Sequence, residues 1–578
     1  MGWIMLRLLK FLAPYRVFVV LVVILAFVQV LSTLYLPLLL SDIVDIGIVQ
    51  GNPSYIIRMG LIMLAVTGLG GIAAIGASLL AAQSAAGFGK LLRSGIFRHV
   101  ENFGPTEFDR LGNSSLIVRT TNDVMQVQQL VNMMLRVMIV APLTSIGGII
   151  MAIHTNGRLA LSMMIVVPAL AVTVYVILGR GIPLFRTMQT KVDNLNRVVR
   201  ENLIGVRVVR AFDRQAYERE RFYGTNADLT QVSTRVFQMM ALMLPFVMLI
   251  MNWATVAIFW WGSLRLSHGA LQVGSLMAFI QYFMQIMFAV MMVSMMAFML
   301  PRGQASALRI WQIFDTPVAI ETRPGQPSVQ PLGRLTLDQV TFVYHGAEAP
   351  ALESVSFKAH VGETIAIIGG TGSGKSTLLN LIPRFYDVAS GAIHWNDTDI
   401  REVSLTSLRS HIGLVPQRPV LFSGTILDNV RYGNLEASES EVRHALEVAQ
   451  AWDFVSRMPE GLYSLISQGG SNLSGGQRQR LAIARALVRQ ASLYLFDDNF
   501  SALDSRTDAA LRQALRHTIH DAIVFIVAQR VTTIMDADRI VVLDDGRLVG
   551  QGTHHELMDT SEVYREIVAS QLSPEEIA

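Results

Sequence analysis

Six long apolar runs dominate the first half of this chain, at roughly 17–40, 59–82, 131–153, 159–179, 241–264 and 273–300. Each run is long enough to cross a bilayer as a helix, which takes about 20 apolar residues. The rest of the chain alternates strand-like and helix-like segments of ordinary polarity. We therefore predict an α-helical membrane domain with six transmembrane helices, followed by an α/β domain.

The basic residues predict how these helices are oriented. Several separate the second run from the third, and a still more basic stretch, 180–235, separates the fourth from the fifth. The loops 41–55, 154–158 and 265–272 carry almost no Lys or Arg. Positive loops stay in the cytoplasm, so both long loops and both termini are predicted there. The first of these loops holds Lys90, Arg93, Arg98, Arg110 and Arg119.

Composition narrows the class further. The chain is 52% hydrophobic and only 16% charged, which excludes an ordinary soluble protein. Its net charge of +3 comes from residues in the loops between apolar runs, so we predict no nucleic-acid partner. The absence of cysteine excludes disulfides, zinc-thiolate sites and thiol catalysis.

The N-terminal segment superficially resembles a signal peptide, because Arg7, Lys10 and Arg16 precede an apolar run. The run is too long for that, and no small-residue cleavage site follows it. We interpret it as the first spanning helix. Residues 3–11, with one apolar and one basic side, are predicted to form an interfacial helix on the membrane surface.

Both long cytoplasmic loops keep helical periodicity, as in VDNLNRVVRENLIGVRVVRAF. We expect their helices to extend out of the membrane and to meet something at their tips. The candidate contact turns are GPTEFDRLG, 104–112, and DRQAYERE, 213–220. Solvated turns without a partner are the alternative.

A stretch rich in Pro and Gly, 318–333, follows the membrane half. Such composition is typical of a linker. It divides the chain into a transmembrane domain at 1–317, the linker at 318–333 and an α/β domain at 334–578.

The α/β domain opens with a phosphate-binding pattern, IGGTGSGKST, between an apolar strand and a helix start. Glycines let backbone N–H groups close around phosphate oxygens, and Lys375 would neutralise the β and γ phosphates. The hydroxyl of Ser376 can ligate Mg²⁺. The predicted ATP-binding residues here are Gly369, Gly370, Thr371, Gly372, Ser373, Gly374, Lys375, Ser376 and Thr377.

A second motif, NLSGGQRQRLAIARALV at 472–488, is followed by LYLFDD and SALD. Together these resemble the ATP-binding cassette, and six membrane helices before one cassette resemble a half-size bacterial ABC exporter of the inner membrane. The resemblance implies that two cassettes stack head to tail, so that each ATP lies between the phosphate loop of one chain and the LSGGQ motif of the other. The implied signature residues are Ser474, Gly475, Gly476 and Gln477.

The same resemblance implies further roles. Tyr344 would stack on adenine, although an ordinary strand aromatic is the alternative. Gln417 would link nucleotide to the membrane loops and reach Mg²⁺, which Asp497 would hold through water. The implied Mg²⁺ site is thus Ser376, Gln417 and Asp497.

Three positions depart from the family pattern. Asp498 stands where the family carries a catalytic Glu, and its carboxylate is one methylene shorter. A general base displaced on this scale can lose about 10²-fold in rate. Gln529 replaces a switch His and cannot relay a proton, and Gln468 replaces a Glu in the loop before LSGGQ.

This combination resembles the degenerate-site subunit of heterodimeric bacterial exporters. We predict a chain that binds ATP well, hydrolyses it poorly at Asp498 and Gln529, and supplies its LSGGQ to a homologous half-transporter that carries the Walker B Glu and the switch His. The alternatives are a slow homodimer, an importer with an exporter fold and a regulatory nucleotide-sensing subunit.

The predicted cargo is a hydrophobic or amphipathic small molecule, a drug or a lipid. The last two apolar runs are rich in Met, whose flexible side chain suits an adaptable cavity. Packing in the core or against lipid is the alternative. Asn252, Gln281 and Gln285 are polar within these runs, either facing a cavity or bonding neighbouring helices.

Overall fold

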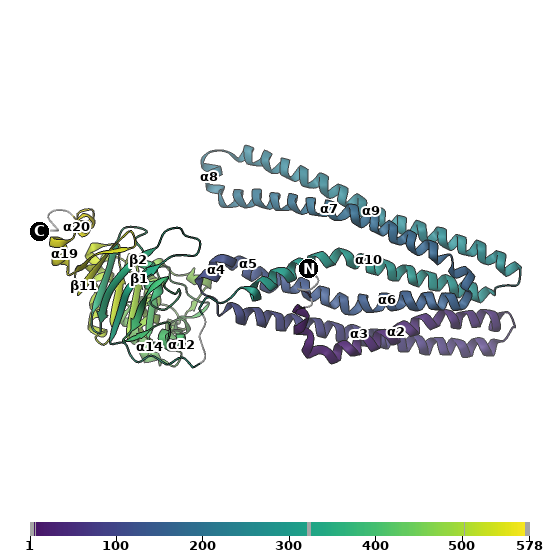
Figure 1. Ribbon diagram of the computed structural model, residues 1–578, viewed down its shortest axis with the longest axis horizontal. Coiled ribbons are helices and arrows are strands. Elements are labelled where there is room, and N and C mark those ends of the chain that lie inside the picture. Colours follow the sequence, from purple (N-terminus) through teal and green to yellow (C-terminus); the bar gives the residue numbers. More distant parts are fainter. Residues whose placement is uncertain (1–4, 6, 321–324, 502, 573–578) are drawn as a thin grey trace. The chain divides into compact units, whose positions relative to one another are not determined.

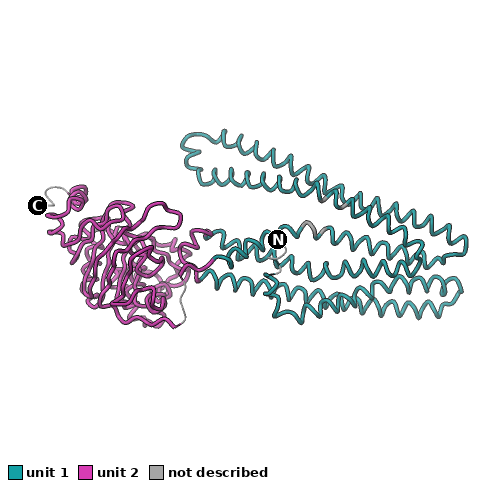
Figure 2. Tube along the Cα trace, viewed as in Figure 1, with its two compact units in different colours: residues 1–101, 113–316 teal, residues 102–112, 317–578 magenta. Residues whose placement is uncertain are grey.

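The computed structural model describes residues 5, 7–320, 325–501 and 503–572. They form two compact units, drawn in different colours in Figure 2. Unit 1 comprises residues 1–101 and 113–316, and unit 2 comprises residues 102–112 and 317–578. A short segment between two membrane helices therefore belongs to the second unit.

Unit 1 is built of long helices, coloured purple to teal in Figure 1. Its elements are η1 (Leu9–Tyr15), α2 (Arg16–Asp42), η2 (Ile43–Ile48), α3 (Pro53–Val100), α5 (Asn113–Val118), η3 (Arg119–Asp123), α6 (Val124–Ala160), α7 (Met163–Ile204), α8 (Val206–Ala211), α9 (Gln215–Ser267) and α10 (Val273–Asp315). Within the residues that the structure describes, six helical segments are long and apolar enough to cross a membrane, which confirms the predicted number.

These helices are longer than a bilayer requires. α9 has 53 residues, and at about 1.5 Å per residue it extends about 80 Å, against a hydrocarbon core of about 30 Å. Within the apolar part, helices satisfy every backbone N–H and C=O internally, as a lipid environment demands. The polar remainder forms the helical extensions that the periodicity of the long loops predicts.

The helices of unit 1 fall into two groups, visible in Figure 1. α2, α3, α6 and α10 pack together, whereas α7 and α9 pack mainly on each other and are joined by α8. In the first group, the hydroxyl of the buried Tyr282 on α10 donates a hydrogen bond of 2.9 Å to the carbonyl of Leu34 on α2. Asp123 is also buried, and it pairs with Arg309 of α10.

The boundaries of two loops differ from the predicted ones. The helix expected to end before 154 continues through a kink at Asn156 to Ala160, and α7 begins at Met163. The predicted contact turn 213–220 is mostly helix, because α9 begins at Gln215. The real tip is α8, which follows the interruption of α7 at Gly205.

The predicted interfacial helix at 3–11 lies partly outside the described residues. Its described part leads into η1, where Phe11 packs on Phe314 at the end of α10 with ring centroids 5.7 Å apart. The guanidinium of Arg7 lies over the ring of Trp311 at 5.1 Å.

Unit 2 combines α4 (Pro105–Leu111) with an α/β fold. A six-stranded sheet has the order β12-β11-β3-β10-β9-β6, a four-stranded sheet the order β2-β1-β4-β5, and β7 pairs with β8. The strands are β1 (Arg334–Phe342), β2 (Leu352–His360), β3 (Thr364–Gly369), β4 (Ser390–Trp395), β5 (Thr398–Asp399), β6 (Ile412–Val415), β7 (Gly424–Thr425), β8 (Leu465–Ile466), β9 (Leu493–Asp497), β10 (Ile523–Val527), β11 (Arg539–Asp544) and β12 (Arg547–Gly552). The predicted fold class is confirmed.

The helices of unit 2 are short. After α4 they are α11 (Lys375–Leu381), α12 (Leu405–Ser410), α13 (Ile426–Arg431), α14 (Glu439–Val448), α15 (Trp452–Val455), η4 (Gly461–Tyr463), η5 (Gln468–Gly470), α16 (Gly475–Leu487), α17 (Ser505–Thr518), α18 (Val531–Ile534), α19 (His554–Thr560) and α20 (Glu562–Ala569).

The central strands are buried on both faces, as expected for parallel strands. In β3, Ile365 and Ile367 point into one hydrophobic cluster, and Ala366 and Ile368 into the other. β3, β10, β9 and β6 run parallel as neighbours, with Val527 in register with both Ile367 and Asp497. Their carboxyl ends therefore meet at one edge of the sheet, where ligands of open α/β sheets bind.

Candidate functional site

The phosphate loop connects the end of β3 to α11. Gly372 and Gly374 have φ angles of 86° and 92°, a region that favours glycine. A Cβ at Gly374 would lie 2.6 Å from the carbonyl oxygen of Ala351, so this position has no room for a side chain. The sequence pattern thus folds into the tight strand-to-helix turn that phosphate binding requires.

Lys375 is held against this loop. Its Nζ donates to the carbonyls of Gly369 at 3.0 Å and Gly370 at 2.6 Å, and to Ser373 Oγ at 3.3 Å. Burial lowers the pKa of Lys375, while the nearby carboxylates of Asp498 and Asp497 act in the opposite direction. An anionic group at the loop would supply the negative charge that a partly desolvated ammonium lacks.

Ser376 and Asp497 form a pair of oxygen ligands at the same edge. Ser376 Oγ donates to Asp497 Oδ1 at 2.9 Å, and burial raises the pKa of Asp497. A divalent cation would offset that desolvation, and Mg²⁺ prefers such hard oxygen ligands, so these residues fit the metal. Bound with ATP, Mg²⁺ would be held by Ser376, Gln417 and Asp497 and would neutralise phosphate charge.

Asp498 lies directly after β9 in a left-handed conformation, with φ 51°. Its backbone N–H donates to Val527 O at 3.0 Å, which fixes it against β10. Its Oδ2 accepts two hydrogen bonds, from Gln529 Nε2 at 2.8 Å and from Gln417 Nε2 at 3.2 Å. Asp498, Gln417 and Gln529 lie in three different motifs of the sequence, and both amides bond the same oxygen of Asp498. Asp498 is buried, with only 7% of its surface exposed.

Asn499, the next residue, is completely buried and connects two other elements. Its Nδ2 donates to Val415 O at 2.7 Å, two residues before Gln417. Its Oδ1 accepts from Gln479 Nε2 of α16 at 3.2 Å. One amide at the end of β9 therefore joins that strand to β6, which leads to Gln417, and to α16, which begins within LSGGQ.

The predicted adenine platform, Tyr344, lies two residues after β1 and is exposed. Its hydroxyl is 2.9 Å from Thr377 Oγ1 on α11. Its ring meets Phe342 edge-on at a centroid distance of 4.8 Å. The structure therefore places this ring beside the phosphate loop.

The LSGGQ residues stand apart from this cluster. Ser474 caps α16: Gln477 N donates to Ser474 Oγ at 3.3 Å, and Ser474 N to Gln477 Oε1 at 2.9 Å. Ser474 and Gly475 are exposed, and Gly476 and Gln477 are half-buried. Among the described residues, no hydrogen bond joins these four to the phosphate loop. Gln468, in η5, is exposed as well.

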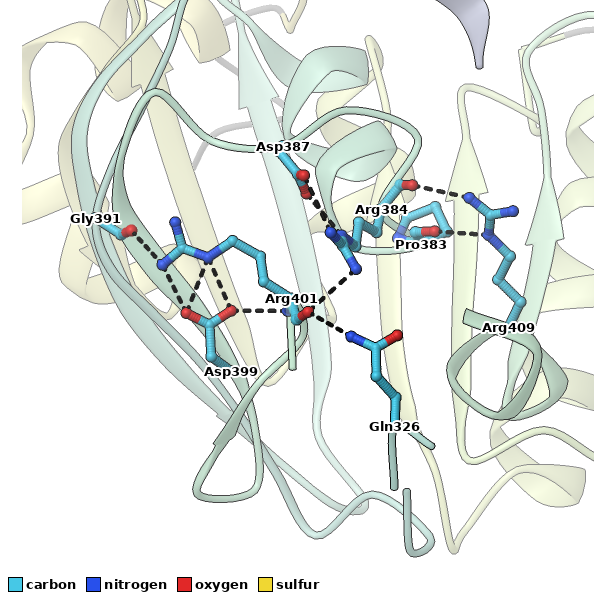
Figure 3. Close-up of polar contacts among 8 residues, drawn as sticks. All are labelled: Gln326, Pro383, Arg384, Asp387, Gly391, Asp399, Arg401 and Arg409. Carbon is cyan, nitrogen blue, oxygen red and sulfur yellow. Dashed lines mark hydrogen bonds and ion pairs between the residues drawn. The ribbon is translucent and has the colours of Figure 1, made fainter. Parts of the chain in front are cut away.

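A polar network braces the segment that follows α11 (Figure 3). Arg384 is buried and donates to both oxygens of Asp387, at 2.7 and 3.1 Å. Arg409 holds the carbonyls of Pro383 and Arg384, and the linker residue Gln326 donates to Arg401 O at 3.0 Å. The figure shows Arg384 and Gln326 converging on that same carbonyl.

The braced segment lies against α4. A Cβ at Gly104 would be 3.5 Å from the carbonyl oxygen of Phe385. The buried carboxylate of Glu107 accepts from Gly104 N at 2.7 Å and from Ala319 N at 2.9 Å. The predicted contact segment 104–112 is therefore packed within unit 2 and tied to the start of the linker.

Two residues at this edge were not predicted. Asn499 carried a weak signal, since it is an amide directly after the acidic pair that ends a buried apolar strand. Gln571 carried none: its amide contacts the backbone of Gln529 and Val531, about 40 residues away.

The amino-acid sequence and the structure are both similar to those of known ABC transporters. Residues 19–290 match the ABC transporter transmembrane region, and residues 352–501 match the ABC transporter family. An uncharacterized ABC transporter ATP-binding protein of Mycobacterium tuberculosis is 46% identical, over 96% of each chain. The ATP-dependent lipid A-core flippase of Chromobacterium violaceum is 31% identical, over 93% of this chain and 91% of its own. The solved structure of a bacterial Atm1-family ABC exporter with ATP bound is 26% identical, with a TM-score of 0.81 over 97% of this chain and 99% of that one.

Proposed function

Because this chain belongs to the ABC transporter family, with a transmembrane region and an ATP-binding domain in one polypeptide, we propose that it is one subunit of an ATP-driven exporter of lipid-like or other hydrophobic compounds. We place it in a bacterial inner membrane with both termini in the cytoplasm. Its likeness to a lipid A-core flippase supports the cargo class, as do the Met-rich helices α9 and α10.

We propose further that the chain's own ATP site binds nucleotide and hydrolyses it slowly. The observation that carries this is the double hydrogen bond to Asp498 Oδ2, from Gln417 and Gln529. A general base must present a free carboxylate oxygen to the attacking water. Here one oxygen is already occupied by two amides, the side chain is a short one, and neither amide can take up a proton.

A second chain would complete the assembly. Ser474 and Gly475 of LSGGQ support this, because they are exposed and the capping bonds of Ser474 are local in the described part of the chain. So does α8, which has no buried residue and presents the exposed apolar side chains of Val208 and Phe212. A patch of similar character, Val420, Phe422, Tyr432 and Leu435, is exposed on unit 2. We propose that the partner is a homologous half-transporter with a catalytic Glu and a switch His, and that α8 docks on such a patch of the partner.

In this assembly ATP closes the two ATP-binding domains, and the helix tips transmit closure to the membrane helices. Lys375 and the phosphate loop would bind the triphosphate, while Gln417 and Gln529 hold Asp498 away from the attacking water. The LSGGQ of this chain serves the partner's site, where hydrolysis resets the transporter. A site that keeps its ATP biases the conformational equilibrium through its affinity for the closed state.

The test is restoration of hydrolysis. We expect the purified chain alone to turn over ATP slowly and the double variant Asp498→Glu with Gln529→His to be about 10- to 100-fold faster. Lys375→Ala in either background should abolish the activity and serves as the control for contaminating ATPases. Brisk hydrolysis by the unmodified chain alone, lost in Asp498→Asn, would support the homodimer instead.

Transport itself can be measured in proteoliposomes. The chain is reconstituted with a candidate homologous half-transporter, and ATP is added outside the vesicles, where it reaches only transporters whose ATP-binding domains face outward. Export then carries fluorescent lipid from the outer to the inner leaflet, where it is protected from quenching by dithionite. Lipid that moves with ATP only in the presence of both subunits supports the proposal. Movement in the opposite direction would identify an importer.

A further inference from the structure

Gln571, two residues after α20, reaches back to the segment that carries Gln529. Its Nε2 donates to the carbonyl oxygen of Gln529 at 2.7 Å. Its Oε1 accepts from the backbone N–H of Val531 at 2.8 Å. A single side-chain amide thus binds the main chain on both sides of Arg530.

These contacts satisfy backbone hydrogen-bonding groups at the start of α18 (Val531–Ile534). Val531 is the first residue of α18, and the N-cap residue Arg530 makes no side-chain capping bond. The first N–H groups of a helix have no partner within it. Gln571 supplies the missing acceptor from a distant part of the chain and bonds the preceding carbonyl as well, so it fixes the path of the backbone from β10 into α18.

The direction of the Gln529 side chain depends on that path. Gln529 lies two residues after β10 and donates a hydrogen bond of 2.8 Å to Asp498 Oδ2. A rotation of its backbone would move the amide off the carboxylate, because the side chain starts from the same peptide that Gln571 holds.

Gln571 is itself firmly anchored. Its backbone N–H donates to Val568 O at 3.0 Å. Tyr564 and Val568 of α20 are buried in the same hydrophobic cluster as Ile534 of α18. The hydroxyl of Tyr564 also bonds His554 Nδ1 of α19 at 2.7 Å. The helical pair α19–α20 therefore forms a fixed support for the amide.

We propose that Gln571 is a positioning residue for the chain's own ATP site: it holds Gln529 on Asp498, and α19–α20 thereby sets how long nucleotide is retained. The inference rests on the proposed function, in which this site retains ATP. If Gln529 is released, the Asp498 carboxylate loses a hydrogen bond, so its negative charge is less well compensated and it repels the γ-phosphate more strongly. This change shortens the residence of nucleotide.

The test uses the full chain in nanodiscs with Mg²⁺ and a fluorescent, non-hydrolysable ATP analogue. In Gln571→Leu both hydrogen bonds are lost, and we expect the analogue to dissociate on the order of 5- to 30-fold faster. Gln571→Glu keeps the acceptor for Val531 and should be intermediate. Glu566→Gln, at an exposed position of α20, should match the unmodified chain.

A purely structural role would lower the thermal midpoint and leave dissociation unchanged, so the midpoint is recorded for every variant. The positioning role also requires that Gln571→Leu add nothing in a Gln529→Ala background. Equal dissociation rates for Gln571→Leu and the unmodified chain, or full additivity of the two substitutions, would overturn the inference. Because the analogue is not cleaved, these rates can be read whichever way the hydrolysis experiment turns out.

Discussion

At the scale of single residues, the site is an electrostatic balance between one ammonium and two adjacent carboxylates. Burial lowers the pKa of Lys375 and raises that of Asp497, so both groups are poorly solvated for charged side chains. A phosphate with Mg²⁺ supplies the missing partner to each of them. The charged forms of Lys375 and Asp497 are therefore more favourable with phosphate and Mg²⁺ bound than in the empty site.

Asp497 gives a pH-dependent prediction. Its raised pKa means that the folded protein binds this proton more tightly than the unfolded chain does. Without nucleotide, this group therefore makes stability rise as the pH falls through the raised pKa toward the unfolded value of 3.8, and it contributes no further change below 3.8. Asp497→Asn removes the buried charge and keeps an oxygen for Ser376, so at pH 7.5 the nucleotide-free unfolding midpoint should rise by about 2–4 °C.

The same variant should gain little from ATP and Mg²⁺, which stabilise the unmodified protein. Differential scanning fluorimetry at pH 5.5 and 7.5, with and without nucleotide, measures both effects. Asp521→Asn, at an exposed position of the same unit, is the control. A nucleotide-free midpoint that falls in Asp497→Asn would contradict the argument.

The sequence predicted which residues gather at the ATP site, but it did not predict the hydrogen bonds between them. Gly369, Asp497 and Gln529 each end or follow a buried apolar strand, so their convergence follows from a parallel sheet. That Gln417 and Gln529 share one oxygen depends on side-chain rotamers, which leave no pattern in the sequence. The contact of Gln571 depends on the packing of α20, which is equally invisible in local periodicity.

At the scale of elements, α4 is a membrane-loop helix packed within the ATP-binding unit. Its Glu107 bonds its own N-terminal backbone and the first residues of the linker, while the segment beneath it extends from α11 of the phosphate loop. One short helix therefore contacts both the start of the linker and the segment that follows the phosphate-loop helix.

Glu107→Gln should weaken this connection. An amide can accept one of the two hydrogen bonds, but it turns an NH₂ group toward the other N–H donor, and leaving a buried donor unpaired costs about 1–3 kcal/mol. In proteoliposomes of the assembled transporter we expect ATPase activity within about 2-fold of normal and lipid movement reduced about 5-fold or more. Arg110→Gln, exposed on the same helix, should change neither, and a parallel loss of both activities in Glu107→Gln would indicate misfolding instead of uncoupling.

The long elements were the most predictable part of the fold. Apolar length alone predicted six spanning helices, and helical periodicity predicted their extensions. Between α7 and α9 the helix is interrupted twice, at Gly205 and again at Asp213, whose φ is 49°. The interruption at Asp213 was predicted, but the one at Gly205, which adds α8 to the tip, was not. Gly and Asp both favour turns, yet the helical periodicity around Gly205 gave no sign of a break.

At the scale of the whole molecule, α7 and α9 pack mainly on each other, and their tip α8 buries none of its residues. Hydropathy identifies which segments span a membrane, but it does not show which helices pack on each other. The pairing of α7 with α9 could therefore not be predicted from the sequence. The exposed surface of α8 is the place where the second chain that we propose would dock.

A charged side chain introduced into α8 tests whether this helix contacts a second chain. Val208 is exposed in the single chain, so Val208→Asp should fold normally and leave ATP binding by the isolated subunit unchanged. In the assembled transporter the aspartate would be buried against the partner, and we expect lipid-stimulated ATPase activity to fall about 10-fold or more. Lys358→Asp, exposed on β2, is the control, and full activity of Val208→Asp would exclude α8 from the interface.

The double origin of unit 2 also has a consequence for biosynthesis. Residues 102–112 leave the ribosome long before residue 317, and at about 5–20 residues per second the remainder takes tens of seconds to follow. Until Ala319 is synthesised, the Glu107 carboxylate lacks one of the two backbone N–H donors that it has in the folded protein. Unit 2 therefore completes its fold only when this early segment is joined by a part of the chain that is made much later.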